Sequence, residues 1–335
     1  MTTPAVLPSP VRIFETLRAY QQTAALRTAI ELDVFTAIGS GAATAAEIAA
    51  QCAASERGIR ILCDTVVTDG FLVKQNGRYS CSPEAAVFLD RSSPACIASV
   101  SRFLCSPETI ARSLSLTDCV RKGGTMESGQ GSVEPDNPLW VLFAQAMGPL
   151  MAMPAQMMAE AIAGSGPLSV LDIAAGHGVF GVAIAKRNPE AQITAVDWAA
   201  VLEVAKENAE KAGVADRVRL LPGSAFEVDF GCGYDIVLIT NFLHHFDPPA
   251  CESFLRKAHA ALKPGGKAIT LEFCPNDDRV TPVMPARFAL TMLLTTTRGD
   301  AYTFRELEDM FRNAGFASNE QRMLPSEQSV IISTK

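Results

Sequence analysis

The sequence is poor in charge and has no long apolar run. Charged residues make up 19% of the 335 residues and hydrophobic residues 48%, a composition that supports a folded core and excludes wholesale disorder. Every apolar stretch is interrupted by charge, glycine or proline, so none is suited to cross a bilayer. The formal net charge of −7 gives no support for a nucleic-acid partner over the whole chain.

Metal-binding patterns are also missing. The nine cysteines never occur with C-x-x-C spacing, and their odd number and wide spread argue against a zinc cluster and a disulfide framework. We therefore expect buried thiols and no metal site. The first ten residues, MTTPAVLPSP, lack the basic start and apolar stretch of a secretory signal, so we expect a cytoplasmic protein.

Residues 1–100 have the pattern of a winged helix. Apolar residues at helical spacing predict a helix over 13–38. Thr44 followed by Glu47 forms a capping box that opens a short helix, and Ser55 opens the next one. Asn76-Gly77 lies between two short extended segments and indicates a hairpin.

Charge decides between DNA binding and dimerisation, the two common uses of such a module. Residues 1–100 hold eight basic and nine acidic side chains, and the helix that would enter a groove carries Glu56, Asp64 and Asp69. A DNA reader needs a basic face to displace counterions. We therefore predict a dimerisation domain and a homodimer without nucleic acid.

Residues 101–165 read as a helical connector, interrupted at 123–138 by a turn-rich stretch that we interpret as a surface loop. A methionine-rich apolar run follows it. Two interpretations stay open for this run: packing between domains, or an adaptable pocket wall for a flat apolar substrate. Met147 and Met151 are the candidates for the wall.

Residues 166–335 alternate between strand and helix patterns, which predicts an α/β domain with a doubly wound, Rossmann-like parallel sheet. A last strand-like segment at 330–333 predicts a closing hairpin at the sheet edge. The expected organisation is a dimerisation domain over 1–100, a connector over 101–165 and a cofactor-binding domain over 166–335.

A glycine-rich loop gives the first chemical signal. G-x-G-x-x-G occupies 176–181, after a strand and before a helix, and Asp197 ends the next strand 21 residues after the first glycine. This spacing fits a dinucleotide as well as a nucleoside cofactor. Asp172 in the strand end would repel phosphate but would suit a cationic amino-acid group. Asp197 is placed to accept ribose hydroxyls, and Trp198 can lie against adenine.

Five motifs in order carry a family resemblance. VLDIAAGHG, AVDW, LLPGSAF, DIVLITNFLHHF and ALKPGGK resemble the class I S-adenosylmethionine-dependent methyltransferases. With its N-terminal segment, nearly the whole chain resembles the dimeric O-methyltransferases of plant phenylpropanoid and bacterial natural-product pathways. The resemblance implies S-adenosyl-L-methionine as cofactor and a small, aromatic, hydroxyl-bearing acceptor.

The resemblance and the glycine loop together assign a cofactor site. It consists of Asp172, Gly176, Gly178, Asp197, Trp198, Ser224, Ala225, Phe226 and Asn241. Ser224 stands where the family has an acid near the adenine, and a hydroxyl makes a weaker hydrogen bond there. Phe288 and Met292 are assigned to the acceptor pocket with Met147 and Met151.

The same resemblance implies a general base. The family's L-H-D-W-S-D-x-x-C aligns with L-H-H-F-D-P-P-A-C, which puts the base on His244 and His245 in place of an aspartate. The first of two family glutamates that flank the base fits Glu272. The position of the second family glutamate is occupied by Ala301, and Asp300 is its neighbour in the sequence. Catalysis by His244, catalysis by His245 and a merely structural pair all remain open.

The charges of the reaction indicate what a base would do. Methyl transfer from a sulfonium removes positive charge from sulfur, so the acceptor oxygen must arrive ionised or lose its proton as it attacks. An imidazole with a pKa near its usual value of about 6.5 can take a phenol proton. Glu272 would orient the ring and stabilise the imidazolium.

Two other functions remain open on the sequence alone. Ser224 and Ala301 depart from the family pattern, which leaves room for non-methylating chemistry such as decarboxylation, hydroxylation or rearrangement. The glycine spacing by itself also fits an NAD-dependent oxidoreductase.

Overall fold

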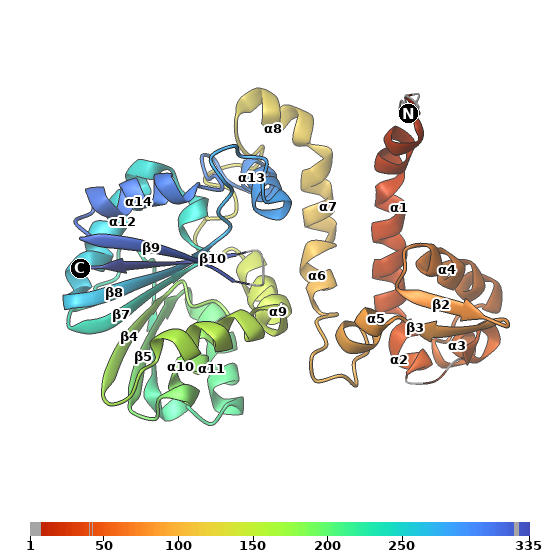
Figure 1. Cartoon of the computed structure of the whole chain (residues 1–335), viewed down its shortest axis with the longest axis horizontal. Coiled ribbons are helices and arrows are strands. Elements are labelled where there is room, and N and C mark those ends of the chain that lie inside the picture. The colour runs from red at the N-terminus through yellow and green to blue at the C-terminus, as the bar shows by residue number, and fades with distance from the viewer. Residues whose placement is uncertain (1–7, 40, 42, 325–327) are drawn as a thin grey trace, which may run out of the picture. The chain divides into compact units, whose positions relative to one another are not determined.

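The computed structural model describes residues 8–39, 41, 43–324 and 328–335, and the chain forms two compact units, 1–106 and 107–335 (Figure 1). The prediction that no secretory signal is present rests largely on residues 1–7, which lie outside the described residues. Within the described ranges, no helix combines the length and apolar character needed to span a membrane.

The first unit is helical with a small antiparallel sheet. The predicted helix over 13–38 is in fact two helices, because Asp33 adopts a left-handed φ of 58° between them. The capping box of Thr44 and Glu47 and the Ser55 cap are confirmed. Asn76-Gly77 joins the hairpin strands, and both residues have positive φ. The elements are α1 (Val11–Glu31), α2 (Val34–Ile38), β1 (Ala43–Thr44), α3 (Ala45–Gln51), α4 (Glu56–Thr68), β2 (Leu72–Gln75), β3 (Arg78–Cys81), α5 (Pro83–Phe88) and α6 (Val100–Leu104).

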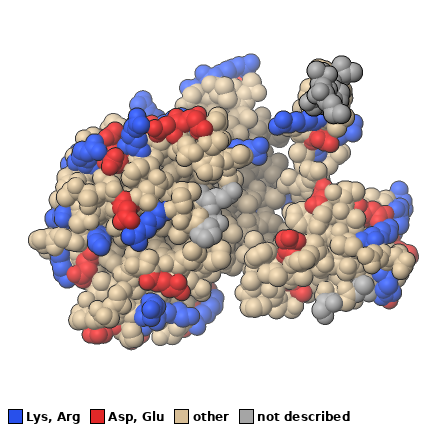
Figure 2. Space-filling view, in the orientation of Figure 1, with Lys and Arg blue, Asp and Glu red and all other residues tan. Residues whose placement is uncertain are grey.

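Asp64 binds two of the basic side chains around α4. Its carboxylate accepts hydrogen bonds from Arg60 at 3.1 Å, from Lys74 at 2.5 Å and from the Tyr79 hydroxyl at 2.7 Å. On the face seen in Figure 2, acidic and basic side chains are interspersed. Of the two arginines on the helix that would read DNA, Arg60 is therefore paired with an acid of the same helix.

The second unit contains a seven-stranded sheet in the order β6-β5-β4-β7-β8-β10-β9. The five strands from β6 to β8 are parallel, as predicted, and β9 and β10 form the predicted closing hairpin, with β10 antiparallel to β8. The elements are α7 (Pro107–Leu114), α8 (Leu116–Lys122), α9 (Leu139–Ile162), β4 (Leu168–Ile173), α10 (Val179–Arg187), β5 (Ala191–Asp197), α11 (Ala199–Lys211), η1 (Ala215–Arg217), β6 (Val218–Pro222), β7 (Tyr234–Thr240), η2 (Leu243–His245), α12 (Pro248–Ala261), β8 (Leu262–Glu272), α13 (Val283–Thr295), α14 (Phe304–Asn313), β9 (Ser318–Met323) and β10 (Ser329–Thr334).

Helices cover both faces of this sheet, with α9, α10 and α11 on one and α12 and α14 on the other (Figure 1). Alternate residues of one strand enter the two cores: Ile236 and Leu238 pack with the α9 and α10 side, Val237 and Ile239 with the α12 and α14 side. The sheet is thus buried on both faces, and its parallel strands end at one common edge.

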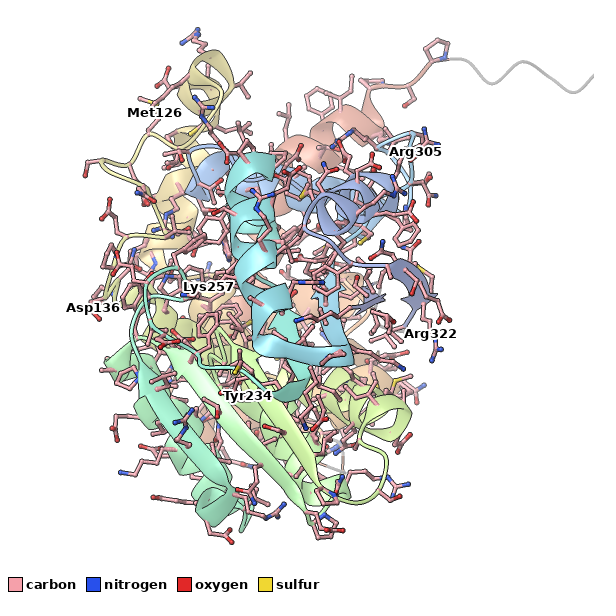
Figure 3. The ribbon with its side chains drawn as sticks, turned by 90° about the vertical axis from the view of Figure 1, so that its left-hand side faces the viewer. Met126, Asp136, Tyr234, Lys257, Arg305 and Arg322 are labelled. Atoms are coloured by element: carbon pink, nitrogen blue, oxygen red, sulfur yellow. The ribbon has the colours of Figure 1, made fainter. Side chains whose placement is uncertain are left out.

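The prediction of a surface loop over 123–138 is wrong for part of the segment. The Thr125 and Ser132 amides donate at 2.8 Å to the carbonyls of Thr296 and Thr295. A Cβ on Gly131 would lie 2.5 Å from the Thr295 oxygen. Met126 and Asp136 lie at the outer edge of the unit in Figure 3, whereas the residues between them include a buried seam along the end of α13.

Candidate active site

The glycine loop turns from β4 into α10 through left-handed backbone. Ala174, Gly176 and Gly178 have φ values of 51°, 56° and 69°. A Cβ on Gly178 would lie 2.9 Å from the Cβ of Ala205, so α11 approaches too closely for a side chain. A Cβ on Gly176 would meet only the Ala174 oxygen at 3.8 Å. The loop is therefore packed at one glycine and open at the other.

Asp197, at the end of β5, is fixed against this loop. Its Oδ2 accepts the Gly176 amide at 2.8 Å, and its Oδ1 accepts the Trp198 amide at 2.7 Å. Burial raises the pKa of Asp197 to about 6, although both amides favour the ionised form. Each carboxylate oxygen keeps acceptor capacity, which suits a pair of ribose hydroxyls.

Asp172, one strand away, is 1% exposed. Its Oδ2 accepts the Gly181 amide at 3.2 Å, while its Oδ1 is buried and has no partner among the described residues. Burial raises the pKa of Asp172 to about 7, and the charge of Asp197 acts in the same direction. An unsatisfied carboxylate oxygen in this position fits the cationic amino-acid group that the sequence analysis expected.

The segment after β6 lies at the same strand-end edge of the sheet as Asp172 and Asp197. The Gly223 amide donates to the Asp197 carbonyl at 2.9 Å, and the Ser224 carbonyl accepts the amides of Glu227 and Val228 at 3.0 and 2.9 Å. The Ser224 hydroxyl accepts the Phe226 amide at 3.2 Å. The serine that replaces the family acid is thus partly engaged in shaping its own turn.

Lys257 of α12 holds this turn from outside, and the sequence analysis did not single it out (Figure 3). Its ammonium donates to the carbonyls of Ala225 at 3.0 Å and Val228 at 2.7 Å and lies 4.1 Å from the Phe230 ring centroid. No sequence motif predicts a lysine that binds backbone carbonyls, because every residue has such a carbonyl whatever its side chain.

Asn241 directly follows β7 with a φ of 53°. Its amide donates to the Leu271 carbonyl at 2.8 Å, and its side-chain oxygen accepts the Gln328 amide at 2.7 Å. This bond pattern leaves the Asn241 side-chain amide at the strand-end edge where Asp172 also stands.

The fourth and fifth parallel strands bring His244 and Glu272 together. Nδ1 of His244 lies 2.5 Å from Oε2 of Glu272, and Oε1 accepts the amides of Phe242 at 3.1 Å and Leu243 at 2.9 Å. The two side chains are 4% and 3% exposed. Because a carboxylate only accepts, Nδ1 of a neutral His244 carries the proton and Nε2 keeps its lone pair. That is the tautomer a general base requires.

His245 has a different environment. Its ring lies edge-on to Trp140 at 5.2 Å and 4.3 Å from the His244 ring, and its Nδ1 is buried with no partner in the described part of the chain. Burial lowers the pKa of His245 well below its usual value, and His244 acts in the same direction. Trp140 is itself fixed by donating to the Ser132 carbonyl at 2.8 Å. Among the described residues, no acid holds the His245 ring as Glu272 holds that of His244.

The predicted acceptor residues divide between the site and the core. Phe288 of α13 presents an edge to His244 at 4.8 Å and packs on Phe273 at 4.4 Å. Met292, on the same helix, is 3% exposed. Met151 is buried in a core that α9 and α10 share with the sheet, inside the second unit. Met147 is half-buried on α9.

The second orienting acid is replaced by another arrangement. Ala301 is fully buried, and the carboxylate of Asp300 pairs with Arg279 at 3.2 Å rather than with imidazole. The Asp300 amide, however, donates to the His244 carbonyl at 3.0 Å. No sequence motif marks Arg279.

Comparison with known proteins gives a consistent result. A model of the O-methyltransferase domain matches residues 122–317, and a model of the O-methyltransferase dimerisation domain matches residues 14–91. A solved structure from Nostoc punctiforme, provisionally described as an O-methyltransferase, is 50% identical with a TM-score of 0.95, covering 98% of this chain and 100% of that one.

Two further relatives have named activities. The 3-hydroxy-5-methyl-1-naphthoate 3-O-methyltransferase of Streptomyces sahachiroi is 26% identical over 93% of this chain and 91% of that protein. The structure of human N-acetylserotonin methyltransferase in complex with S-adenosylmethionine has a TM-score of 0.85 at 20% identity, covering 100% of this chain and 99% of that one. At this identity the second likeness shows a shared fold.

Proposed function

This chain belongs to the O-methyltransferase family and is an S-adenosylmethionine-dependent methyltransferase, and from that premise we propose that it methylates a hydroxyl group on a small aromatic acceptor, with His244 as the general base. The observation that carries the proposal is the buried pair of His244 and Glu272, which leaves Nε2 of His244 as a free base. Phe288 and Phe273 beside it offer the flat apolar surface that an aromatic ring packs against.

The cofactor supplies, when bound, a methyl group on a positively charged sulfur. Asp197 would accept the ribose hydroxyls and Asp172 would face the amino-acid group. Gly176, Gly178, Trp198, Ser224, Ala225, Phe226 and Asn241 complete this site. Its acids are already fixed by backbone amides, so they need little rearrangement to bind.

The protein's own contribution to the reaction is proton removal and alignment. Nε2 of His244 takes the proton of the acceptor hydroxyl as that oxygen attacks. Glu272 stabilises the imidazolium that forms, because its carboxylate already holds Nδ1–H. Much of the remaining acceleration comes from holding the oxygen in line with the methyl group.

The acceptor class is tested by a methyl-transfer screen with mass detection of products, using phenols, hydroxyquinones and carboxylic acids. A gain of one methyl group on phenolic oxygen is the expected result, since the Streptomyces sahachiroi relative is named for a hydroxynaphthoate. Methylation of carboxylates alone would contradict the aromatic hydroxyl proposal. A thermal-shift comparison of S-adenosylhomocysteine with NAD separates the two cofactor classes, because only a ligand of the folded state stabilises it.

We further propose that the enzyme is a homodimer assembled through its dimerisation domain. The apolar residues Val11, Ile13, Phe14, Leu17 and Tyr20 of α1 are between 53% and 68% exposed in the single chain. A surface of this kind marks a protein–protein interface. Light scattering at micromolar concentration should give the mass of two chains, and the mass of one chain would contradict the proposal. A cytoplasmic location remains a prediction from the sequence.

A further inference from the structure

Arg279 connects three parts of the second unit near the base. Its Nη1 donates to Oδ2 of Asp300 at 3.2 Å and to the Ala301 carbonyl at 3.4 Å, and its Nη2 pairs with Glu306. The arginine lies a few residues after Glu272, in a turn closed by its own amide to the Asn276 carbonyl at 2.8 Å. One guanidinium therefore joins the segment after β8 to the turn before α14 and to the first turn of α14.

The turn that Arg279 holds packs directly on the backbone of His244. The Asp300 amide donates to the His244 carbonyl at 3.0 Å. Gly299 lies so close that an added Cβ would stand 2.3 Å from that same carbonyl oxygen and 3.0 Å from the His245 carbonyl carbon. The Gly299 amide is fixed in turn by the Thr296 hydroxyl at 2.8 Å. A displacement of this turn would therefore disturb the hydrogen bond and the close packing that hold the His244 main chain.

We propose that Arg279 is a positioning residue for the general base, acting through the Asp300 main chain on His244. This rests on the proposed function of His244. It also explains how His244 is held although Ala301 occupies the position where the family resemblance implies a second orienting acid. The ring of His244 is oriented by Glu272, and its backbone is held by the turn that Arg279 secures.

The chemistry of the side chain suits this task. The Arg279 and Asp300 side chains are 42% and 40% exposed, and a single ion pair at such exposure contributes little. Arg279, however, bonds at once to Asp300, to Ala301 and to Glu306, and the planar fork of a guanidinium fixes the relative geometry of all three. Glu306 also accepts the Thr303 amide at 2.8 Å in the capping box of α14, so the guanidinium is anchored to a helix.

The test compares Arg279→Gln with Arg305→Gln. Arg305, labelled in Figure 3, is a matched control because it pairs with Asp277 at 2.8 Å in the same region and is 74% exposed. Among the described residues it makes no hydrogen bond or ion pair with the 299–301 turn. Each variant is assayed with two phenols, one neutral and one already ionised at the assay pH. Arg279→Gln should lower kcat about fivefold to twentyfold for the neutral phenol and less than about twofold for the ionised one. Its Kd for S-adenosylhomocysteine should be unchanged, and Arg305→Gln should match the wild type.

Equal losses of kcat for both phenols would overturn the proposal, because a fall in the folded or active fraction does not distinguish acceptors. A loss in Arg305→Gln as large as in Arg279→Gln would overturn it as well. In a His244→Ala background, Arg279→Gln should produce no further loss with the neutral phenol, and a fully additive loss would contradict action through His244. If His244→Ala alone keeps the wild-type rate, the general-base function itself fails, and that result is distinct from these.

Discussion

The two halves of the active site are built in different ways. The cofactor half, residues 172–228 together with Asn241, uses mainly consecutive loops that leave the ends of β4, β5 and β6, and backbone amides hold its two acids. The base half gathers His244, Glu272, Phe288 and Asp300 from separate stretches of chain, and it is held by side-chain pairs as well as by backbone amides. Binding is therefore organised locally, whereas proton transfer depends on distant segments meeting correctly.

His244→Ala separates the halves most strongly. Loss of a positioned proton acceptor should lower the methylation rate of a neutral phenol by about 10² to 10⁴. The affinity for S-adenosylhomocysteine, measured by calorimetry, should stay within a few-fold. His245→Ala serves as the matched variant and should cost less, because no acid orients its ring. A near-normal rate in His244→Ala would mean that the two histidines are structural.

Asp197→Ala tests the cofactor half instead. The change should weaken cofactor binding by about 2–4 kcal/mol, because it removes the carboxylate that we propose accepts the two ribose hydroxyls and that the Gly176 and Trp198 amides already hold in place. Calorimetry with S-adenosylhomocysteine measures this, with Asp216→Ala, an exposed acid on η1, as control. Unchanged affinity in Asp197→Ala would remove this residue from the site.

The pH dependence of binding should belong to the cofactor half. Burial raises the pKa of Asp197 to about 6, and the ionised form is the one that accepts hydroxyls. Protons therefore compete with the cofactor below that value, and Asp197 alone should raise the Kd for S-adenosylhomocysteine about tenfold from pH 7 to pH 5. Asp172, whose pKa burial raises to about 7, acts in the same direction and adds to this rise. Asp197→Asn should remove the tenfold part that titrates near pH 6 and leave the part that belongs to Asp172, and an unchanged slope would contradict the assignment.

Lys257→Met should give the smallest effect, and it tests whether Lys257 belongs to the cofactor half or to the base half. It keeps the apolar stem but removes the donor to the Ala225 and Val228 carbonyls. The KM for S-adenosylmethionine should rise about threefold, with kcat unchanged at saturation, because a loosened turn affects binding and leaves proton removal intact. Lys257→Arg should restore the KM in part. A fall in kcat at unchanged KM would place Lys257 with the base half instead.

The local part of the candidate site could be predicted from the sequence. The glycine loop and the two acids 25 residues apart are predicted from their spacing, because each acid lies at the end of its own strand. Glu272 was assigned only through the family resemblance, since nothing near it in sequence indicates a histidine partner. Arg279 carried no signal at all, because its partners include a backbone carbonyl and its effect reaches His244 through a main-chain bond. The helix over 13–38 was drawn too long, since periodicity does not report a left-handed residue such as Asp33.

The insertion of β10 between β8 and β9 bears on the order in which the enzyme assembles. β8, which carries Glu272, gains its second neighbour only when β10 pairs with it. The pairing of Ser329 with Glu272 spans 57 residues of chain, against 31 for the pairing of Thr240 with Leu271 on the other side. Such non-local pairings form late, because loop-closure entropy is spent before they stabilise the chain. During refolding we expect the nucleoside-binding loops to become competent first, so that a population able to bind S-adenosylhomocysteine precedes one able to turn over.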